Sequence, residues 1–148
     1  MKLNKEGYQL ITTFEGFYSI PYLDSVKVPT IGYGNTYYQN GKRVTLLDGK
    51  ITKEQAFEMF KDIADNFAKR VSEFLKKEVT QNQFNSLVSI SYNIGIDNFK
   101  NSTLLRKVNV NPNDKSIRAE FIKWNKAGGK VLKGLTNRRN AEAKIYFT

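Results

Sequence analysis

Thr30-Ile31-Gly32-Tyr33-Gly34-Asn35-Thr36 is an informative segment for predicting the fold of this chain. Residues that favour β-structure are interrupted by two glycines, a pattern typical of an extended segment that bends. These glycines permit either close approach of a ligand to the backbone or only a bend in a strand. Just upstream, residues 18–23 alternate imperfectly between apolar and other residues, which predicts a neighbouring strand.

Two turn signals follow this stretch. Asn40-Gly41 lies between β-forming residues, and this pair is the strongest short signal for a hairpin because both turn positions need a positive φ. Asp48-Gly49 marks a second turn. We therefore predict a small antiparallel sheet within residues 17–51.

Helices are predicted on both sides of this sheet. Residues 3–15 place apolar side chains three and four positions apart, and Gly16 can close that helix in a left-handed conformation. Capping boxes at residues 52–55 and 80–83 open two long helices. Shorter helices are expected at about 102–108, 114–126 and 136–147.

This order of elements predicts the class and the organisation of the fold. A helix, a small sheet and then several helices indicate an α+β protein with its sheet near the N-terminus. The 148 residues suit one domain, 1–148, with a sizeable core. We expect a cleft between a sheet lobe at about 15–51 and a helical lobe at about 52–148.

The composition excludes several kinds of chemistry, because the chain contains no Cys and no His. Disulfides, thiol nucleophiles and thiolate metal sites need cysteine. Imidazole bases, Ser-His-Asp triads and His-ligated zinc need histidine. Acid–base chemistry therefore falls to Asp, Glu, Lys or Tyr, and only a purely carboxylate metal site stays open.

The charge is distributed unevenly along the chain. Residues 1–74 contain 10 Lys and Arg against 9 acidic residues, whereas residues 75–148 contain 14 against 5. A basic surface favours an anionic polymer, which could be nucleic acid, anionic lipid or an acidic cell wall. Solubility alone is an equally good explanation of the charge.

The first residues, Met1 to Glu6, contain no apolar run long enough for a signal core, and no stretch of the chain suits a membrane span. We therefore expect a soluble intracellular product without stable membrane insertion. The absence of Cys agrees with folding in a reducing compartment. We also expect a monomer.

Two carboxylates lie close to the start of the predicted sheet. Glu15 lies where the first helix ends, Asp24 nine residues later, and Thr30 six residues after that. A chain that leaves a helix and doubles back as a hairpin can gather these three around one cleft. Glycoside hydrolysis needs one carboxyl group as a proton donor and a second, ionised one to activate water or to stabilise positive charge. Caps and solvated charges at element ends are the commoner explanation of such residues.

The residues around this trio resemble a known family. Glu15-Gly16, residues 22–24 and residues 29–36 are similar to the N-terminal motif of the phage-type, T4-lysozyme-like endolysins, in which Glu, Asp and Thr have this same spacing. The resemblance covers the whole chain. Its further segments are Ile51–Ala56, Phe84–Val88, Tyr92–Gly95, Phe99, Ser102–Leu105, Trp124, Gly134–Arg139 and Glu142.

The resemblance implies a muramidase that needs no metal and no cofactor. It would cut the β-1,4 bond between N-acetylmuramic acid and N-acetylglucosamine in peptidoglycan, and so lyse the bacterial host at the end of a phage cycle. The family's general acid corresponds to Glu15, its water-positioning Asp to Asp24 and its water-holding Thr to Thr30. The best-studied members of the family invert. The resemblance also implies storage in the host cytoplasm until a phage-encoded membrane pore gives access to the wall.

Further positions follow from the same resemblance. Arg138, or its neighbour Arg139, falls where an arginine pairs with the catalytic Glu. Tyr92 and Asn93 fall where an aromatic residue and an amide line the sugar cleft, although core packing and helix capping explain them equally well. Many relatives have His where this chain has Asn35, so a charged pair is not expected at that position.

Three other functions remain as alternatives. The first is a catalytically silent wall-binding protein on the same fold, which an intact trio of Glu, Asp and Thr argues against. The second is a nucleic-acid-binding domain, favoured by 24 basic residues but lacking any recognition motif. The third is a lytic transglycosylase, which needs one acid and leaves Asp24 without a role.

Overall fold

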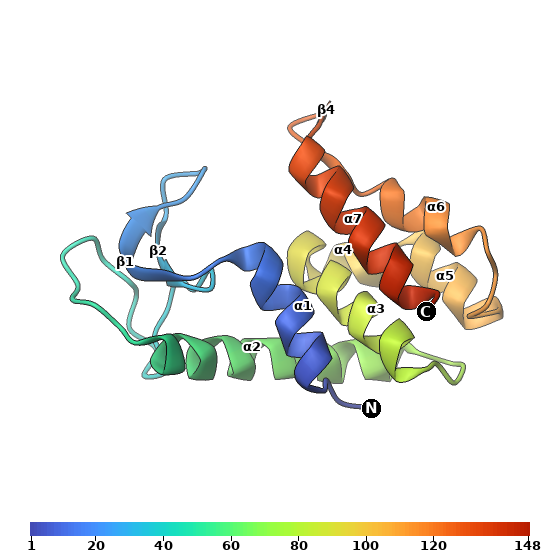
Figure 1. Cartoon of the computed structure of the whole chain (residues 1–148), viewed down its shortest axis with the longest axis horizontal. Helices are drawn as coiled ribbons and strands as arrows, with labels where there is room; N and C mark the ends of the chain where they lie inside the picture. Colours follow the sequence, from blue (N-terminus) through green and yellow to red (C-terminus); the bar gives the residue numbers. More distant parts are fainter.

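The longest helix, α2 (Lys53–Phe74), extends from the small N-terminal sheet to the helical part of the molecule (Figure 1). The computed structural model describes all residues from Met1 to Thr148. Before α2 come α1 (Lys5–Glu15), β1 (Tyr18–Leu23) and β2 (Pro29–Gly32). After it come α3 (Gln81–Ile94), α4 (Ile96–Lys100), α5 (Thr103–Val110), α6 (Ile117–Ile122), β3 (Lys126–Ala127), β4 (Lys130–Val131) and α7 (Lys133–Tyr146).

The two predicted capping boxes are confirmed. The Thr52 hydroxyl accepts from the Gln55 amide while the Gln55 side chain accepts from the Thr52 amide, and Thr80 and Gln83 do the same. Each box satisfies two backbone donors that have no partner inside the helix. These pairs fix the starts of α2 and α3, in which apolar side chains recur at helical spacing.

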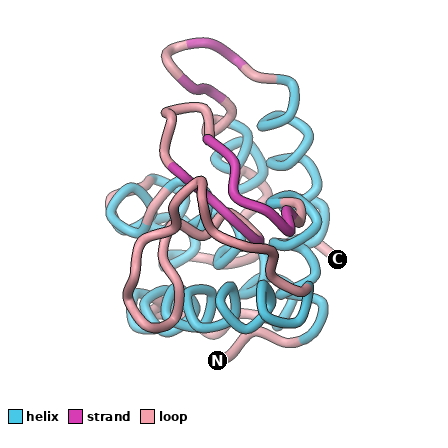
Figure 2. Tube along the Cα trace, turned by 90° about the vertical axis from the view of Figure 1, so that its left-hand side faces the viewer, coloured by secondary structure: helices cyan, strands magenta, loops and turns pink.

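The N-terminal sheet is smaller than the sequence predicts. Only β1 and β2 pair, antiparallel, with Tyr22 opposite Thr30 and a register shift between Tyr18 and Tyr22. Figure 2 shows these two strands facing the viewer, with long loops beside them. The sheet stands at one end of α2, so it brings residues 15–32 next to the helical part of the chain.

The hairpin predicted around Asn40-Gly41 is wrong beyond its turn. Gly41 has a φ of 83° and its amide donates to the Tyr38 carbonyl, yet the flanking residues form only one isolated bridge, between Tyr37 and Arg43. Most of the side chains in this loop are exposed, including Leu47 at 96%. The Tyr38 amide donates to the Lys42 carbonyl and closes the turn, but among residues 37–49 only Val44 is buried, which is too little burial to hold two strands together.

Helix α3 is the centre of the core. It packs against α1, α2 and α7, and its residues from Gln83 to Ser91 are all buried. A helix that is enclosed on every side needs apolar or small residues all around, and its sequence meets this need. No helix of the structure is both long and apolar enough to cross a membrane.

The C-terminal part differs from the prediction in detail. Helix α4 was not expected, α6 is shorter than the predicted 114–126, and α7 begins three residues before the predicted 136. Residues 126–131 form a two-stranded hairpin, with Gly128 and Gly129 at φ values of 57° and 78°. This hairpin projects from the start of α7, apart from the β1–β2 sheet (Figure 1).

Candidate active site

Glu15 is the last residue of α1 and faces the final helix. Arg138 of α7 donates from Nη1 to Glu15 Oε2 at 2.8 Å, and the two side chains are 5% and 20% exposed. The other carboxylate oxygen of Glu15 lies beside Gly34, where a Cβ atom would come within 3.4 Å of it. Gly34 has a φ of 86°, so both its conformation and its lack of a side chain suit this close approach. Glu15 is thus held by an arginine and retains limited access to solvent.

Asp24 is fixed by the turn that joins β1 to β2. Its Oδ1 accepts from the amides of Val26 and Val28, each at 2.9 Å, and its own amide donates to the Val28 carbonyl. Its Oδ2 accepts no hydrogen bond from the protein, since both bonds to this carboxylate end on Oδ1. The turn therefore orients the carboxylate and leaves one oxygen available.

Thr30 is joined to the same turn. Its hydroxyl donates to the Val28 carbonyl at 2.8 Å, and the residue is buried. The lone pairs of that hydroxyl stay free to accept a hydrogen bond, because the proton is already committed. Val28 thus holds both Asp24 and Thr30 in place through its backbone.

Tyr22 lies near enough to both carboxylates for their charges to affect it. Burial raises the pKa of its phenol, and the nearby Tyr18, Glu15 and Asp24 raise it further. Its ring also packs on that of Tyr18, with 4.2 Å between centroids.

Tyr92 and Asn93 lie at the end of α3, near this group. Burial raises the pKa of Tyr92, Glu15 raises it further and Arg138 opposes the shift. The Tyr92 ring also packs against the rings of Phe60 and Phe67, so it belongs to the core as well as to the site. Asn93 is exposed, and its Oδ1 accepts from Arg139 Nη2 at 2.7 Å.

Comparisons with known proteins show the family of this chain. The family model described as phage lysozyme matches residues 12–142. The chain belongs to the phage lysozyme family. It is 38% identical to the endolysin of Bacillus phage B103 over 150 residues, which cover 100% of this chain and 55% of that protein. The chain therefore spans about half the length of that relative.

Solved structures show the same lysozyme-like α+β fold. The endolysin from Escherichia coli O157:H7 phage FAHEc1 superposes with a TM-score of 0.91 at 38% identity, covering 99% of this chain and 93% of that one. The muramidase domain of SpmX from Asticaccaulis excentricus superposes with a TM-score of 0.84 at 28% identity, covering 99% and 98%. The fold class predicted from the sequence is confirmed.

In this phage lysozyme chain, the structure separates the two candidate arginines. Arg138 pairs with Glu15, whereas Arg139 contacts Glu142, with 2.8 Å between Nε and Oε1. Asn35 is buried, and neither its side-chain oxygen nor its nitrogen has a hydrogen-bond partner. No three His, Cys, Asp or Glu side chains gather closely enough to hold a metal ion.

Sequence reasoning did not single out Tyr22 or the arrangement around Arg139 and Glu142. Tyr22 was readable only as part of a motif, since its proximity to both carboxylates depends on how the chain folds around β1. Arg138, Arg139 and Glu142 are spaced at i, i+3 and i, i+4, which predicts neighbouring side chains on a helix but not their burial.

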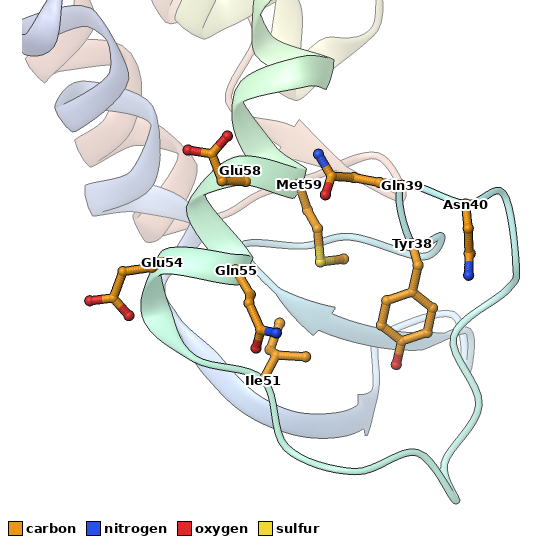
Figure 3. Close-up of a pocket in the computed structure, with 8 residues that line it drawn as sticks. All are labelled: Tyr38, Gln39, Asn40, Ile51, Glu54, Gln55, Glu58 and Met59. Carbon is orange, nitrogen blue, oxygen red and sulfur yellow. The ribbon is translucent and has the colours of Figure 1, made fainter.

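A pocket of about 510 Å³ lies elsewhere, between the start of α2 and the loop after β2 (Figure 3). Glu54 and Glu58 from α2 and Tyr38 from the loop are among its lining residues. It contains none of the candidate catalytic residues.

Proposed function

We propose that this chain is a lysozyme-type glycoside hydrolase, an endolysin that cuts the β-1,4 bond between N-acetylmuramic acid and N-acetylglucosamine in peptidoglycan. The observation that carries the proposal is a pair of fixed carboxylates, Glu15 held by Arg138 and Asp24 held by the turn between β1 and β2. Membership of the phage lysozyme family and the likeness to a muramidase domain support the same reaction.

The roles follow from the hydrogen bonds of each group. Glu15 donates a proton to the glycosidic oxygen, since it has partial access to solvent and an oxygen not bound by Arg138. The free Oδ2 of Asp24 orients a water molecule, and the Thr30 hydroxyl accepts a hydrogen bond from that water. Direct attack by this water inverts the anomeric carbon. Tyr92 and Asn93 contact the sugar from the helical side.

Product analysis tests this function. Digestion of purified peptidoglycan should release fragments with reducing muramic acid ends, which mass spectrometry distinguishes from 1,6-anhydro-muramic acid. Anhydro products would establish a lytic transglycosylase instead. Binding to the wall without any released fragment would establish a silent wall-binding protein.

Asp24→Asn should lower the rate of wall lysis by at least about 100-fold, because a neutral amide orients and polarises water poorly. The amide oxygen can still accept from Val26 and Val28, so the turn and the melting temperature should change little. The measurement is the initial rate of turbidity loss of a wall suspension.

Asp114→Asn is the matched control. Asp114 also accepts a backbone amide two residues ahead, that of Ser116, in a turn far along the chain before α6. This variant should lyse walls at the wild-type rate. An Asp24→Asn variant as fast as Asp114→Asn would remove Asp24 from the mechanism.

We also propose that the basic second half of the chain attracts an anionic wall to a monomeric enzyme held in the host cytoplasm until a membrane pore releases it. Lys126, Lys130 and Lys133 are exposed on or beside the β3–β4 hairpin, and no acidic side chain pairs with them. Attraction between exposed charges is screened beyond about 8 Å at physiological salt.

Reversing Lys126, Lys130 and Lys133 to Glu should slow lysis of whole cells by about tenfold at low salt and flatten its salt dependence. The melting temperature should stay nearly constant, because these side chains are exposed. Hydrolysis of a short uncharged chitin-type oligomer, where accepted, is the control and should not change. Equal salt slopes for the wild type and the variant would refute attraction through this hairpin.

A further inference from the structure

Two consecutive arginines of α7 lie buried beneath the candidate site. Arg138 is 4% exposed and Arg139 is fully buried, yet they reach different partners. Arg138 donates to Glu15 of α1, and Arg139 donates to Asn93 at the end of α3 and to the Trp124 carbonyl. Each arginine therefore joins the interior to a residue of the site.

Glu142, one turn further along α7, is the group that both arginines share. Its carboxylate is completely buried. Arg138 Nε donates to Oε2 at 3.3 Å, Arg139 Nε lies 2.8 Å from Oε1, and the Ser89 hydroxyl of α3 donates to Oε2. Burial raises the pKa of Glu142, while the two guanidiniums and Ser89 oppose this shift.

These contacts orient the guanidinium groups. A guanidinium is planar, so fixing Nε on one carboxylate also fixes the direction of its two Nη atoms. With Nε of Arg138 on Glu142 and Nη2 on the Ser89 carbonyl at 3.4 Å, Nη1 is directed at Glu15. Without Glu142, only the Ser89 carbonyl and the Phe14 ring, whose centroid lies 5.4 Å from Arg138 Cζ, would hold Arg138 against Glu15.

The same contacts balance the charge. Two guanidiniums face two carboxylates, Glu15 and Glu142, in a region that is almost closed to water. Tyr22 of β1 and Tyr92 of α3 are the other titratable groups that interact with Glu15, and Asp24, in the turn after β1, also interacts with Tyr22. Buried charges interact strongly, so removing one of the four changes the field at the other three.

We propose that Glu142 is a positioning residue for Glu15: it holds Arg138 in contact with the Glu15 carboxylate and offsets the positive charge that Arg138 and Arg139 would otherwise place there. This inference rests on the proposed function insofar as Glu15 is the proton donor. Glu142 does not touch substrate in this account, and it acts only through the arginines.

The proposal predicts opposite effects for two variants. Glu142→Gln leaves an excess positive charge that favours the ionised form of Glu15. The proton donor is then lost at lower pH, and the alkaline limb of the pH–rate profile should move down by at least about half a pH unit. Arg139→Gln leaves an excess negative charge and should move that limb up.

The double variant Glu142→Gln/Arg139→Gln restores the balance of charge, so its alkaline limb should return toward that of the wild type. It also provides a folded reference should Glu142→Gln alone fold poorly, since an unpaired buried guanidinium is costly. The shift of the alkaline limb in Arg139→Gln is a second test, which does not depend on whether Glu142→Gln folds.

Glu120→Gln is the matched control. Glu120 is a buried carboxylate of α6 with two cationic partners, Lys107 and Lys123, and it contacts none of the site residues. This variant should lose stability as Glu142→Gln does and leave the pH profile unchanged. If the pH–rate profile moved equally in Glu142→Gln and Glu120→Gln, the role of Glu142 would be structural only and the proposal would be wrong.

Glu15 is also to be titrated directly by carbon NMR of labelled glutamate side chains, with Glu15→Gln used to assign its signal. Opposite shifts of that signal in Glu142→Gln and Arg139→Gln support the proposal, and unmoved or parallel shifts overturn it. Because this measurement needs no substrate, it tests the inference even if the wild type lyses no wall. A lytic wild type with an unmoved Glu15 signal would refute the inference alone.

Discussion

Glu15→Gln is expected to lower the rate of wall lysis at least about 1,000-fold, because the variant keeps the size of the side chain and loses the proton that it donates. The glutamine oxygen can still accept from Arg138, whose guanidinium also remains paired with Glu142. The fold should therefore persist. Turbidity loss of a wall suspension measures the rate, and circular dichroism confirms that the variant is folded.

Glu6→Gln is the control for this experiment. Glu6 lies in the first turn of the same helix, on its exposed side, and touches no residue of the site. Its replacement should leave lysis unchanged. A Glu15→Gln variant that kept more than a tenth of the wild-type rate would mean that another group donates the proton.

The second large effect concerns stability. Phe60→Ala should lower the free energy of unfolding by about 3–5 kcal/mol, because the removed ring leaves a cavity in the core. Phe60 is fully buried in the middle of α2. Its ring packs on the aromatic rings of Tyr8, Tyr33, Phe57 and Tyr92. These neighbours belong to α1, the turn after β2, α2 itself and α3, so one ring joins the N-terminal region to the helices.

Urea denaturation measures this loss as a lower midpoint at an unchanged slope. Ile63→Ala, three residues further along α2, is the control, since Ile63 is 39% exposed and its truncation leaves no enclosed cavity. It should cost under about 1 kcal/mol. A Phe60→Ala variant no less stable than Ile63→Ala would mean that the neighbouring rings collapse into the space.

The sequence predicts those parts of the fold that depend on residues close to one another along the chain. Helices α2 and α3 begin at Thr52 and Thr80 because the capping side chains lie within four residues of each other. The prediction of a hairpin at Asn40-Gly41 was wrong because a turn depends on neighbouring residues, whereas the pairing of its strands depends on contacts with more distant ones. Strand pairing depends on burial of one face of the strands, and among residues 37–49 only Val44 is buried, against Ile31 and Met59.

The candidate site likewise has features that spacing along the chain predicts and features that only tertiary packing determines. The spacing of Glu15, Asp24 and Thr30 is readable along the chain, and in the structure the charges of both carboxylates act on Tyr22. The choice between Arg138 and Arg139 was not readable, because both lie on one turn of helix and only the packing of α7 against α3 decides which one reaches Glu15. Tertiary packing, not spacing, also sets the burial of Glu142.

The contact between Glu15 and Arg138 spans 123 positions of the chain. A polypeptide is made from its N-terminus, and contacts between distant residues close late. Glu15 therefore leaves the ribosome long before Arg138 has been synthesised. A nascent or prematurely ended chain lacking α7 would carry Glu15, Asp24 and Thr30 without the guanidinium that holds Glu15. Synthesis must therefore proceed through α7 before the contact that holds Glu15 can form.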